Sequence, residues 1–205
     1  MRQTETTKVI TGRGRPLVAL LVVAGLAVGA AAVFRVLDVV SPSLDPVAGG
    51  DLPTGAVTAA DGVLPEGATV FDDRYPGVAN LDATLLQALR TAAAAAAQAG
   101  VTFYVSSGWR SPAYQDQLLR EAIVEHGSSA AARWVATSDK SLHVTGQAAD
   151  IVGFDAQEWL SAYGAAYGLC QVYANEPWHY EWRSQAASQG CPGLYPDPTA
   201  DPRLG

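Results

Sequence analysis

The chain is 205 residues long, which is enough for one domain with appended segments, and its formal net charge is −7. Beyond residue 35 it carries 8 Lys and Arg against 19 Asp and Glu. Proteins that bind nucleic acids need a basic face, so this balance excludes that class, and we expect no nucleic-acid partner.

The N-terminal segment predicts export. Residues 17–34 are eighteen uncharged, mostly apolar residues, and a helix of that length spans about 27 Å, close to the hydrocarbon thickness of a bilayer. Four basic residues precede this run: Arg2, Lys8, Arg13 and Arg15. By the positive-inside rule we expect a cytoplasmic N-terminus at 1–16, a single transmembrane signal anchor at 17–35, and a domain outside the cell membrane. A cleaved signal peptide is the alternative, because the alanines at 30–32 suit a cleavage site, and the protein would then be secreted.

The rest of the chain divides by composition. Residues 36–73 are rich in Pro, Gly, Ala and Asp without lasting periodicity, which predicts a flexible linker. Regular patterns then run through 74–185, where we expect the folded domain. The tail at 186–205 contains four prolines and no periodic pattern.

The domain mixes helices and strands in an order that ends in a hairpin. We expect helices at 82–98, 112–126, 130–135 and 155–167, and strands at 101–105, 147–152, 169–173 and 178–182. Asp82 and Ser111 are typical helix caps, and Asp155 with Glu158 resembles a capping box. This order predicts an α+β fold with a mainly antiparallel central sheet flanked by helices.

The strand alternation also orients polar residues. Ala148, Asp150 and Val152 share one face of their predicted strand, and the small Ala148 leaves room beside Asp150. In the final hairpin, His179 and Glu181 point the same way.

Two cysteines, Cys170 and Cys191, suit an exported protein, in which an even count predicts a disulfide bond. The closed loop of about twenty residues would contribute about 3 kcal/mol. Two buried free thiols are the alternative.

Two of the three histidines stand near carboxylates. His143 precedes Asp150 across a turn at Gly146, and His179 follows Glu176 by three residues. Two imidazoles and one carboxylate are a common ligand set for a catalytic zinc, which keeps a fourth position for water. We therefore predict one Zn²⁺ held by His143, Asp150 and His179, with Glu176 free to act as general base. The third histidine, His126, ends a helix and is interpreted as structural.

The sequence also resembles a known family. The motifs are Ser141-x-His143-x-x-Gly146-x-Ala148-x-Asp150, Glu176-Pro177-Trp178-His179, and Ser107-Gly108-Trp109-Arg110-Ser111 followed by Gln115. They are similar to the zinc D-alanyl-D-alanine carboxypeptidases of the VanY type, which belong to a wider group with lysostaphin-like enzymes and the hedgehog signalling domain. The chain departs at Leu142, where many relatives carry a glutamate that is not a ligand. The departure leaves the metal site intact but affects the rim of the cleft.

The resemblance implies a substrate and further site residues. Relatives act on peptidoglycan stem peptides, and their residues matching Ser141 and Gln115 hold the terminal groups of the peptide. Arg110 is the candidate cation for the charge of a tetrahedral intermediate and for substrate binding. Glu181 either hydrogen-bonds a ligand histidine or is a solvated strand residue.

Three functions stay open at this point. The leading hypothesis is a D-alanyl-D-alanine carboxypeptidase that works as a monomer and contacts the membrane only through its N-terminal helix. The same chemistry could instead serve an L,D-carboxypeptidase or an L-alanyl-D-glutamate-type endopeptidase. A non-catalytic zinc-containing cell-wall binding module is the alternative from another class, although such a module has no use for Glu176.

Overall fold

The computed structural model describes residues 56–204. The predicted cytoplasmic segment 1–16, the predicted membrane or signal segment 17–35, and the first part of the predicted linker, 36–55, lie outside the described residues. Among residues 56–204, no helix combines the length and the apolar character that crossing a membrane requires.

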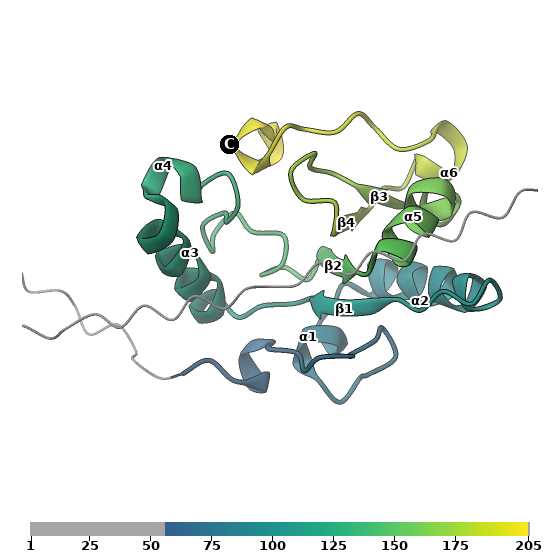
Figure 1. The fold of residues 1–205 in the computed structure, drawn as a ribbon, viewed down its shortest axis with the longest axis horizontal. Coiled ribbons are helices and arrows are strands. Elements are labelled where there is room, and N and C mark those ends of the chain that lie inside the picture. Colours follow the sequence, from purple (N-terminus) through teal and green to yellow (C-terminus); the bar gives the residue numbers. More distant parts are fainter. Residues whose placement is uncertain (1–55, 205) are drawn as a thin grey trace, which may run out of the picture. The chain divides into compact units, whose positions relative to one another are not determined.

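The described residues form an α+β fold, as the sequence predicts (Figure 1). The α-helices are α1 (Pro76–Ala79), α2 (Ala83–Ala97), α3 (Pro112–His126), α4 (Ser128–Ala131), α5 (Phe154–Tyr163) and α6 (Ala186–Gln189). The strands are β1 (Tyr104–Ser107), β2 (Ala148–Val152), β3 (Leu169–Gln171) and β4 (His179–Trp182). Short 3₁₀ helices are η1 (Ala59–Asp61), η2 (Gly164–Tyr167), η3 (Pro198–Ala200) and η4 (Pro202–Leu204).

The four strands form one sheet in the order β1-β2-β4-β3, and every neighbouring pair is antiparallel. The last strand in the sequence therefore lies inside the sheet, between β2 and β3. This order sets Asp150 of β2 directly opposite His179 of β4, and Ala148 opposite Glu181. In Figure 1, α3 and α4 lie at one end of the sheet, and α2, α5 and α6 lie at the other.

The hydrophobic core lies on one face of the sheet. Helices α2 and α5 contribute buried Leu and Ala side chains and the partly buried Trp159, which pack with Ala149, Ile151 and Tyr180 of the strands. Because side chains alternate along a strand, Asp150, His179 and Glu181 point to the opposite face. The two-residue alternation that directs apolar side chains into the core thus also places the polar side chains together on the other face.

The two predicted helix caps occur as expected. The Asp82 carboxylate accepts hydrogen bonds from the backbone N–H groups of Thr84 and Leu85, and the Ser111 hydroxyl accepts one from Tyr114. These caps satisfy N–H groups that have no partner inside the helix.

Several details differ from the sequence prediction. The predicted helix 155–167 is α5 followed by the 3₁₀ helix η2, and the predicted strand 169–173 ends at Gln171. Strand β1 begins at Tyr104 rather than 101, because Tyr104 pairs with Val152, where β2 ends, and earlier residues have no strand to pair with. Helix α4 covers Ser128–Ala131 rather than 130–135. A turn follows it, in which the N–H groups of Trp134 and Val135 both donate to the carbonyl of Ala131. Asp155 is not a cap, since α5 begins after Gly153 without a side-chain hydrogen bond.

Segments on both sides of the predicted domain also fold. Val70 lies in the predicted linker, yet it is fully buried in the core, and its carbonyl accepts a hydrogen bond from Arg90. In the predicted tail, Pro198 and Asp201 are buried. The sequence of these segments has little periodicity, and their side chains are buried by residues far away in the chain. A local sequence pattern cannot predict such burial.

Candidate metal centre

Three elements bring the predicted ligands together. Asp150 and His179 face each other on β2 and β4, and His143 lies on the loop before β2. That loop turns sharply at Gly146, whose φ is +74°. A side chain there would also collide with the backbone carbonyl of Asn80, so the turn that presents His143 requires glycine.

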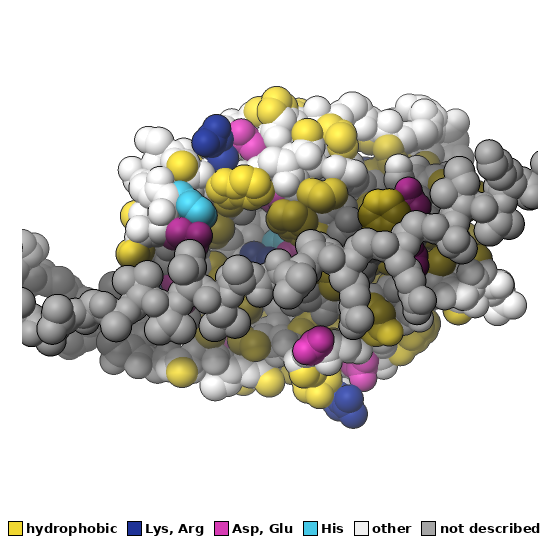
Figure 2. Space-filling view, in the orientation of Figure 1, with side chains coloured by type: hydrophobic (Ala, Val, Ile, Leu, Met, Phe, Trp, Pro, Cys, Tyr) yellow, Lys and Arg dark blue, Asp and Glu magenta, His cyan; other side chains and the backbone are white. Residues whose placement is uncertain are grey.

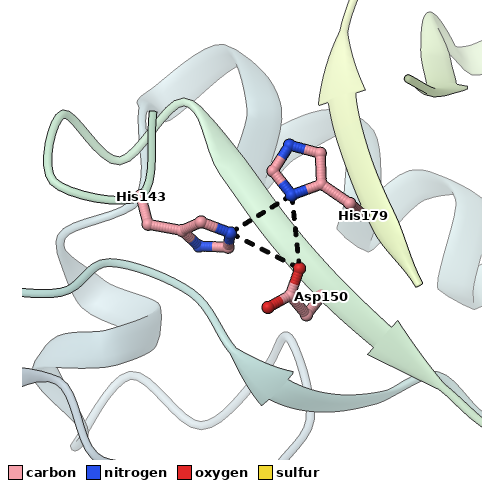
Figure 3. A group of neighbouring side chains, drawn as sticks. All are labelled: His143, Asp150 and His179. Carbon is pink, nitrogen blue, oxygen red and sulfur yellow. Dashed lines mark hydrogen bonds and ion pairs between the residues drawn. The ribbon is translucent and has the colours of Figure 1, made fainter. Parts of the chain in front are cut away.

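The ligand atoms converge on one point (Figure 3). His143 Nε2 and His179 Nδ1 each lie 3.4 Å from Asp150 Oδ1 and 3.3 Å from each other. Tetrahedral zinc ligands at about 2.0–2.1 Å from the ion stand about 3.3–3.4 Å apart. The three residues are also buried, each with 5–6% of its surface exposed. Asp150 Oδ1 is buried without a hydrogen-bond partner, and a bound cation would coordinate this oxygen.

Hydrogen bonds behind the rings orient both histidines. His143 Nδ1 lies 2.8 Å from the carbonyl oxygen of Gly108, so it donates its proton there and leaves Nε2 free to ligate. His179 Nε2 lies 3.3 Å from Glu181 Oε1, so the same logic leaves its Nδ1 free. The donor set therefore fits a zinc ion.

Charge and burial set the protonation of the metal-free site. Burial, and then the charge of Arg110, lower the pKa of His143. Burial also disfavours the charged form of His179, but the adjacent carboxylates of Asp150 and Glu181 outweigh this and raise the pKa of His179 to about 9. Burial would raise the pKa of Asp150, but the neighbouring cationic groups hold it well below its ordinary value. A metal ion must displace the His179 proton, so binding releases protons.

Glu176 lies beside the ligands and is not one of them. The residue is 6% exposed, and its Oε2 lies 3.7 Å from His179 Nδ1. Its other oxygen, Oε1, is buried without a partner. Burial raises the pKa of Glu176 to about 7. A bound cation would favour the carboxylate and lower this pKa, which suits a group that accepts a proton from water.

Arg110 is fixed by three partners. Its Nη2 donates to Asp150 Oδ2 at 2.8 Å, its Nε to Ser107 Oγ at 2.7 Å, and its Nη1 to Gln115 Oε1 at 3.1 Å. Gln115 is itself buried and donates to the carbonyl of Ala136 at 2.8 Å. An arginine has five N–H donors, so two remain for another acceptor.

A cleft of about 410 Å³ joins these groups. Figure 2 shows a hollow in this face, with histidine, acidic and basic atoms at its floor. All predicted site residues line it: Arg110, Gln115, Ser141, His143, Asp150, Glu176 and His179. His126 lies at the cleft too, with its Nε2 3.7 Å from the Glu125 carboxylate.

Two residues of this region are not predicted from the sequence. The Tyr173 ring packs against His179, with ring centroids 5.0 Å apart, and it lines the cleft. Its position at the end of the predicted strand 169–173 was the one sequence feature that could have indicated it. Arg203 reaches Glu181 from the C-terminal segment, residues 191–204, and no pattern in the sequence marks it.

The chain also matches a known protein family. A family model described as VanY, D-alanyl-D-alanine carboxypeptidase, matches residues 78–185. No curated protein matches the chain significantly.

Solved structures also resemble the chain. One is a mutant of the vancomycin-resistance D,D-pentapeptidase VanY from a VanB-type resistance cassette in complex with Zn(II). It is 27% identical, with 56% of this chain and 80% of that one covered and a TM-score of 0.51. VanYB in complex with D-alanine-D-alanine is 26% identical, with 53% and 75% covered and a TM-score of 0.50. The LD-carboxypeptidase LdcB, at 24% identity, with 62% and 71% covered and a TM-score of 0.50, shares the fold.

Proposed function

Because the chain belongs to the VanY family of D-alanyl-D-alanine carboxypeptidases, we propose that it is a zinc-dependent carboxypeptidase that removes the terminal D-alanine from peptidoglycan stem peptides. The zinc-bound VanY structure and the D-alanine-D-alanine complex of VanYB support the metal and the substrate class.

One observation carries the proposal. The ligand atoms of His143, Asp150 and His179 stand 3.3–3.4 Å apart, and one of them, Asp150 Oδ1, is buried without a hydrogen-bond partner. Directly beside them is Glu176, a buried acid with a pKa of about 7. A binding module would need the ligands alone, whereas hydrolysis needs the ligands and a base.

The residues divide the chemistry between them. Zinc, when bound, activates water and polarises a peptide carbonyl. Glu176 lies within reach of the same point, where it accepts the proton of the attacking water and then returns it to the leaving amine. Bound zinc would lower the pKa of Glu176 from its metal-free value of about 7, so the carboxylate is the form that meets the attacking water.

Arg110 serves the substrate. Its bond to Asp150 fixes the guanidinium at the cleft wall, and two N–H donors are left for acceptors on a bound peptide. These donors stabilise negative charge on the reacting carbonyl oxygen or on the terminal carboxylate. Gln115 contributes by holding Arg110, because its own amide atoms already bond Arg110 and Ala136. Ser141 lines the cleft and is assigned to a terminal group of the peptide.

The test uses the purified full chain with one equivalent of zinc and three defined stem peptides. These are a pentapeptide ending in D-Ala-D-Ala, a tetrapeptide ending in a single D-alanine, and a peptide with both termini blocked. Mass spectrometry should find one D-alanine released from the pentapeptide and none after chelation. Release from the tetrapeptide alone would reassign the protein as an L,D-carboxypeptidase, and cleavage of the blocked peptide as an endopeptidase. Zinc binding without cleavage of any of the three peptides would support the alternative function, a non-catalytic binding module.

We propose further that the domain acts outside the cell, because the charge asymmetry around 17–35 sends the chain outward. Protease added to intact cells should digest the domain and spare an N-terminal tag. A domain protected until lysis would contradict this topology.

A further inference from the structure

Glu181 stands directly behind one of the metal ligands. Nδ1 of His179 faces Asp150 and His143, and Nε2 on the other side of the ring faces Glu181 Oε1 at 3.3 Å. Glu181 is only 2% exposed. A buried carboxylate is stable in one orientation only when cationic or hydrogen-bonding partners hold it. The orientation of the His179 ring therefore depends on what holds Glu181.

Its principal partner comes from the C-terminal segment. Arg203, in η4, donates from Nη1 to Glu181 Oε2 at 2.7 Å and from Nη2 to Oε1 at 3.2 Å. This is a two-point pairing that fixes the plane of the carboxylate. Arg183 adds a single contact to Oε2 at 2.8 Å. Only the pairing with Arg203 engages the oxygen that meets His179.

Arg203 is itself held in place. Its Nε donates to Asp201 Oδ1 at 2.8 Å, and Nη2 also contacts the Asp201 carboxylate. Asp201 is 3% exposed and accepts a hydrogen bond of 3.0 Å from the Tyr173 hydroxyl. A continuous chain of hydrogen bonds thus runs from the segment that follows β3 to the back of His179.

The C-terminal segment is secured beside the site along its length. The Tyr195 N–H donates to the Val172 carbonyl at 3.0 Å, and the Ala174 N–H donates to the Tyr195 carbonyl at 2.8 Å. The disulfide between Cys170 and Cys191 ties the start of this segment to β3. Figure 1 shows the segment, in yellow, returning from α6 past the β3–β4 hairpin. Its far end, with Pro198 and Leu204, lines the same cleft as the ligands.

We propose that this C-terminal segment, which lies beyond the matched family region 78–185, is part of the metal centre. Arg203 fixes Glu181, and Glu181 fixes the orientation and tautomer of His179, so that Arg203 sets the affinity of the chain for zinc. Both are positioning residues, since neither is a predicted ligand and Glu176 remains the base. The inference rests on the proposed zinc function, but it concerns binding and not cleavage.

The competing interpretation is that Arg203 only anchors the chain terminus. Both interpretations allow a loss of stability when Arg203 is replaced. Only the proposed role changes the dissociation constant of zinc in a protein that stays folded. Residues that hydrogen-bond a metal ligand typically change metal affinity by about 10–100-fold when replaced, and this sets the expected effect.

The experiment measures zinc affinity of the purified full chain by competition with a chromophoric chelator at fixed pH. Arg203→Gln should raise the zinc dissociation constant about 10–100-fold. Arg90→Gln is the matched control, because Arg90 is similarly exposed (28% against 32%), pairs with Asp73 and also donates to a backbone carbonyl. It lies away from the metal centre and should leave zinc affinity unchanged.

Two further measurements separate the interpretations. At saturating zinc, Arg203→Gln should recover most of its hydrolytic rate, because the base and the ligands are intact, and Arg203→Lys should restore part of the zinc affinity. If Arg203→Gln fails to fold, Glu181→Gln makes the same comparison, since it keeps the shape and the acceptor but removes the charge.

A folded variant with unchanged zinc affinity would overturn the role of Arg203 and leave the proposed function standing. An unmodified chain that binds no zinc would refute the proposed function, and this inference with it.

Discussion

Replacement of Glu176 by Gln separates catalysis from metal binding. Glu176 Oε2 is 3.7 Å from His179 Nδ1, and its Oε1 has no hydrogen-bond partner. Glutamine has the same shape, breaks no hydrogen bond of Oε1 and cannot accept the proton of water as a base. We therefore expect the variant to fold with unchanged stability and to keep about one equivalent of zinc, since three ligands remain.

The loss of activity follows from the surroundings of Glu176. Loss of a general base typically costs about 10²–10⁴ in rate, which corresponds to about 2.7–5.5 kcal/mol of barrier. Neither of the two other acids that contact the ligand histidines can replace it. Asp150 is a predicted ligand and is paired with Arg110, and Glu181 lies behind His179, paired with Arg203. We expect a loss in the upper half of that range.

The assay follows D-alanine release from the pentapeptide, with zinc content measured by elemental analysis on the same sample. Glu158→Gln is the control, because Glu158 is an exposed glutamate of α5, the helix that packs on the opposite face of the sheet. Near-normal hydrolysis by Glu176→Gln would show that the base lies elsewhere. Loss of zinc together with activity would show that Glu176 is a ligand, and the assignment of Asp150 would have to be reopened.

Three further predictions test the site and its support. His143→Ala or His179→Ala should lose most of the bound zinc by elemental analysis, and a stoichiometric metal content in both would mean that the ligands are wrong. Replacing Cys170 and Cys191 by Ser should lower the free energy of unfolding by about 3 kcal/mol in a denaturant titration, and an unchanged midpoint would contradict the role of the disulfide. Hydrogen bonds from His179 and Arg203 overcome burial and lower the pKa of Glu181 from 4.5 to about 2. Its contribution to stability is therefore present above about pH 4.5 and is lost as the pH falls toward 2. The free energy of unfolding of the metal-free chain should therefore fall more steeply with decreasing pH between about pH 4.5 and 2 than that of Glu181→Gln. Identical pH dependences of the two proteins would refute this linkage.

Local sequence determined much of this fold. Capping residues fixed the starts of α2 and α3, and alternation along β2 and β4 put Asp150, His179 and Glu181 on one face. These features depend on neighbours within a few residues, so the pattern of side chains reports them directly. The predicted disulfide between Cys170 and Cys191 is confirmed as well. Its pairing was predictable because the chain has no other cysteine.

The partners across the chain were decided by tertiary structure alone. Arg110 pairs with Asp150 across forty residues, and Arg203 pairs with Glu181 across twenty-two. The sequence left Glu181 open between a hydrogen-bonded and a solvated residue, because periodicity shows which face a side chain takes and not what covers that face. The strand order places β4 beside β2, and the C-terminal segment, which carries no periodic pattern, folds back over the far side of His179. Hydrogen bonds between distant segments form only after the sheet has brought them together, and this is why the support behind His179 could not be predicted from the sequence.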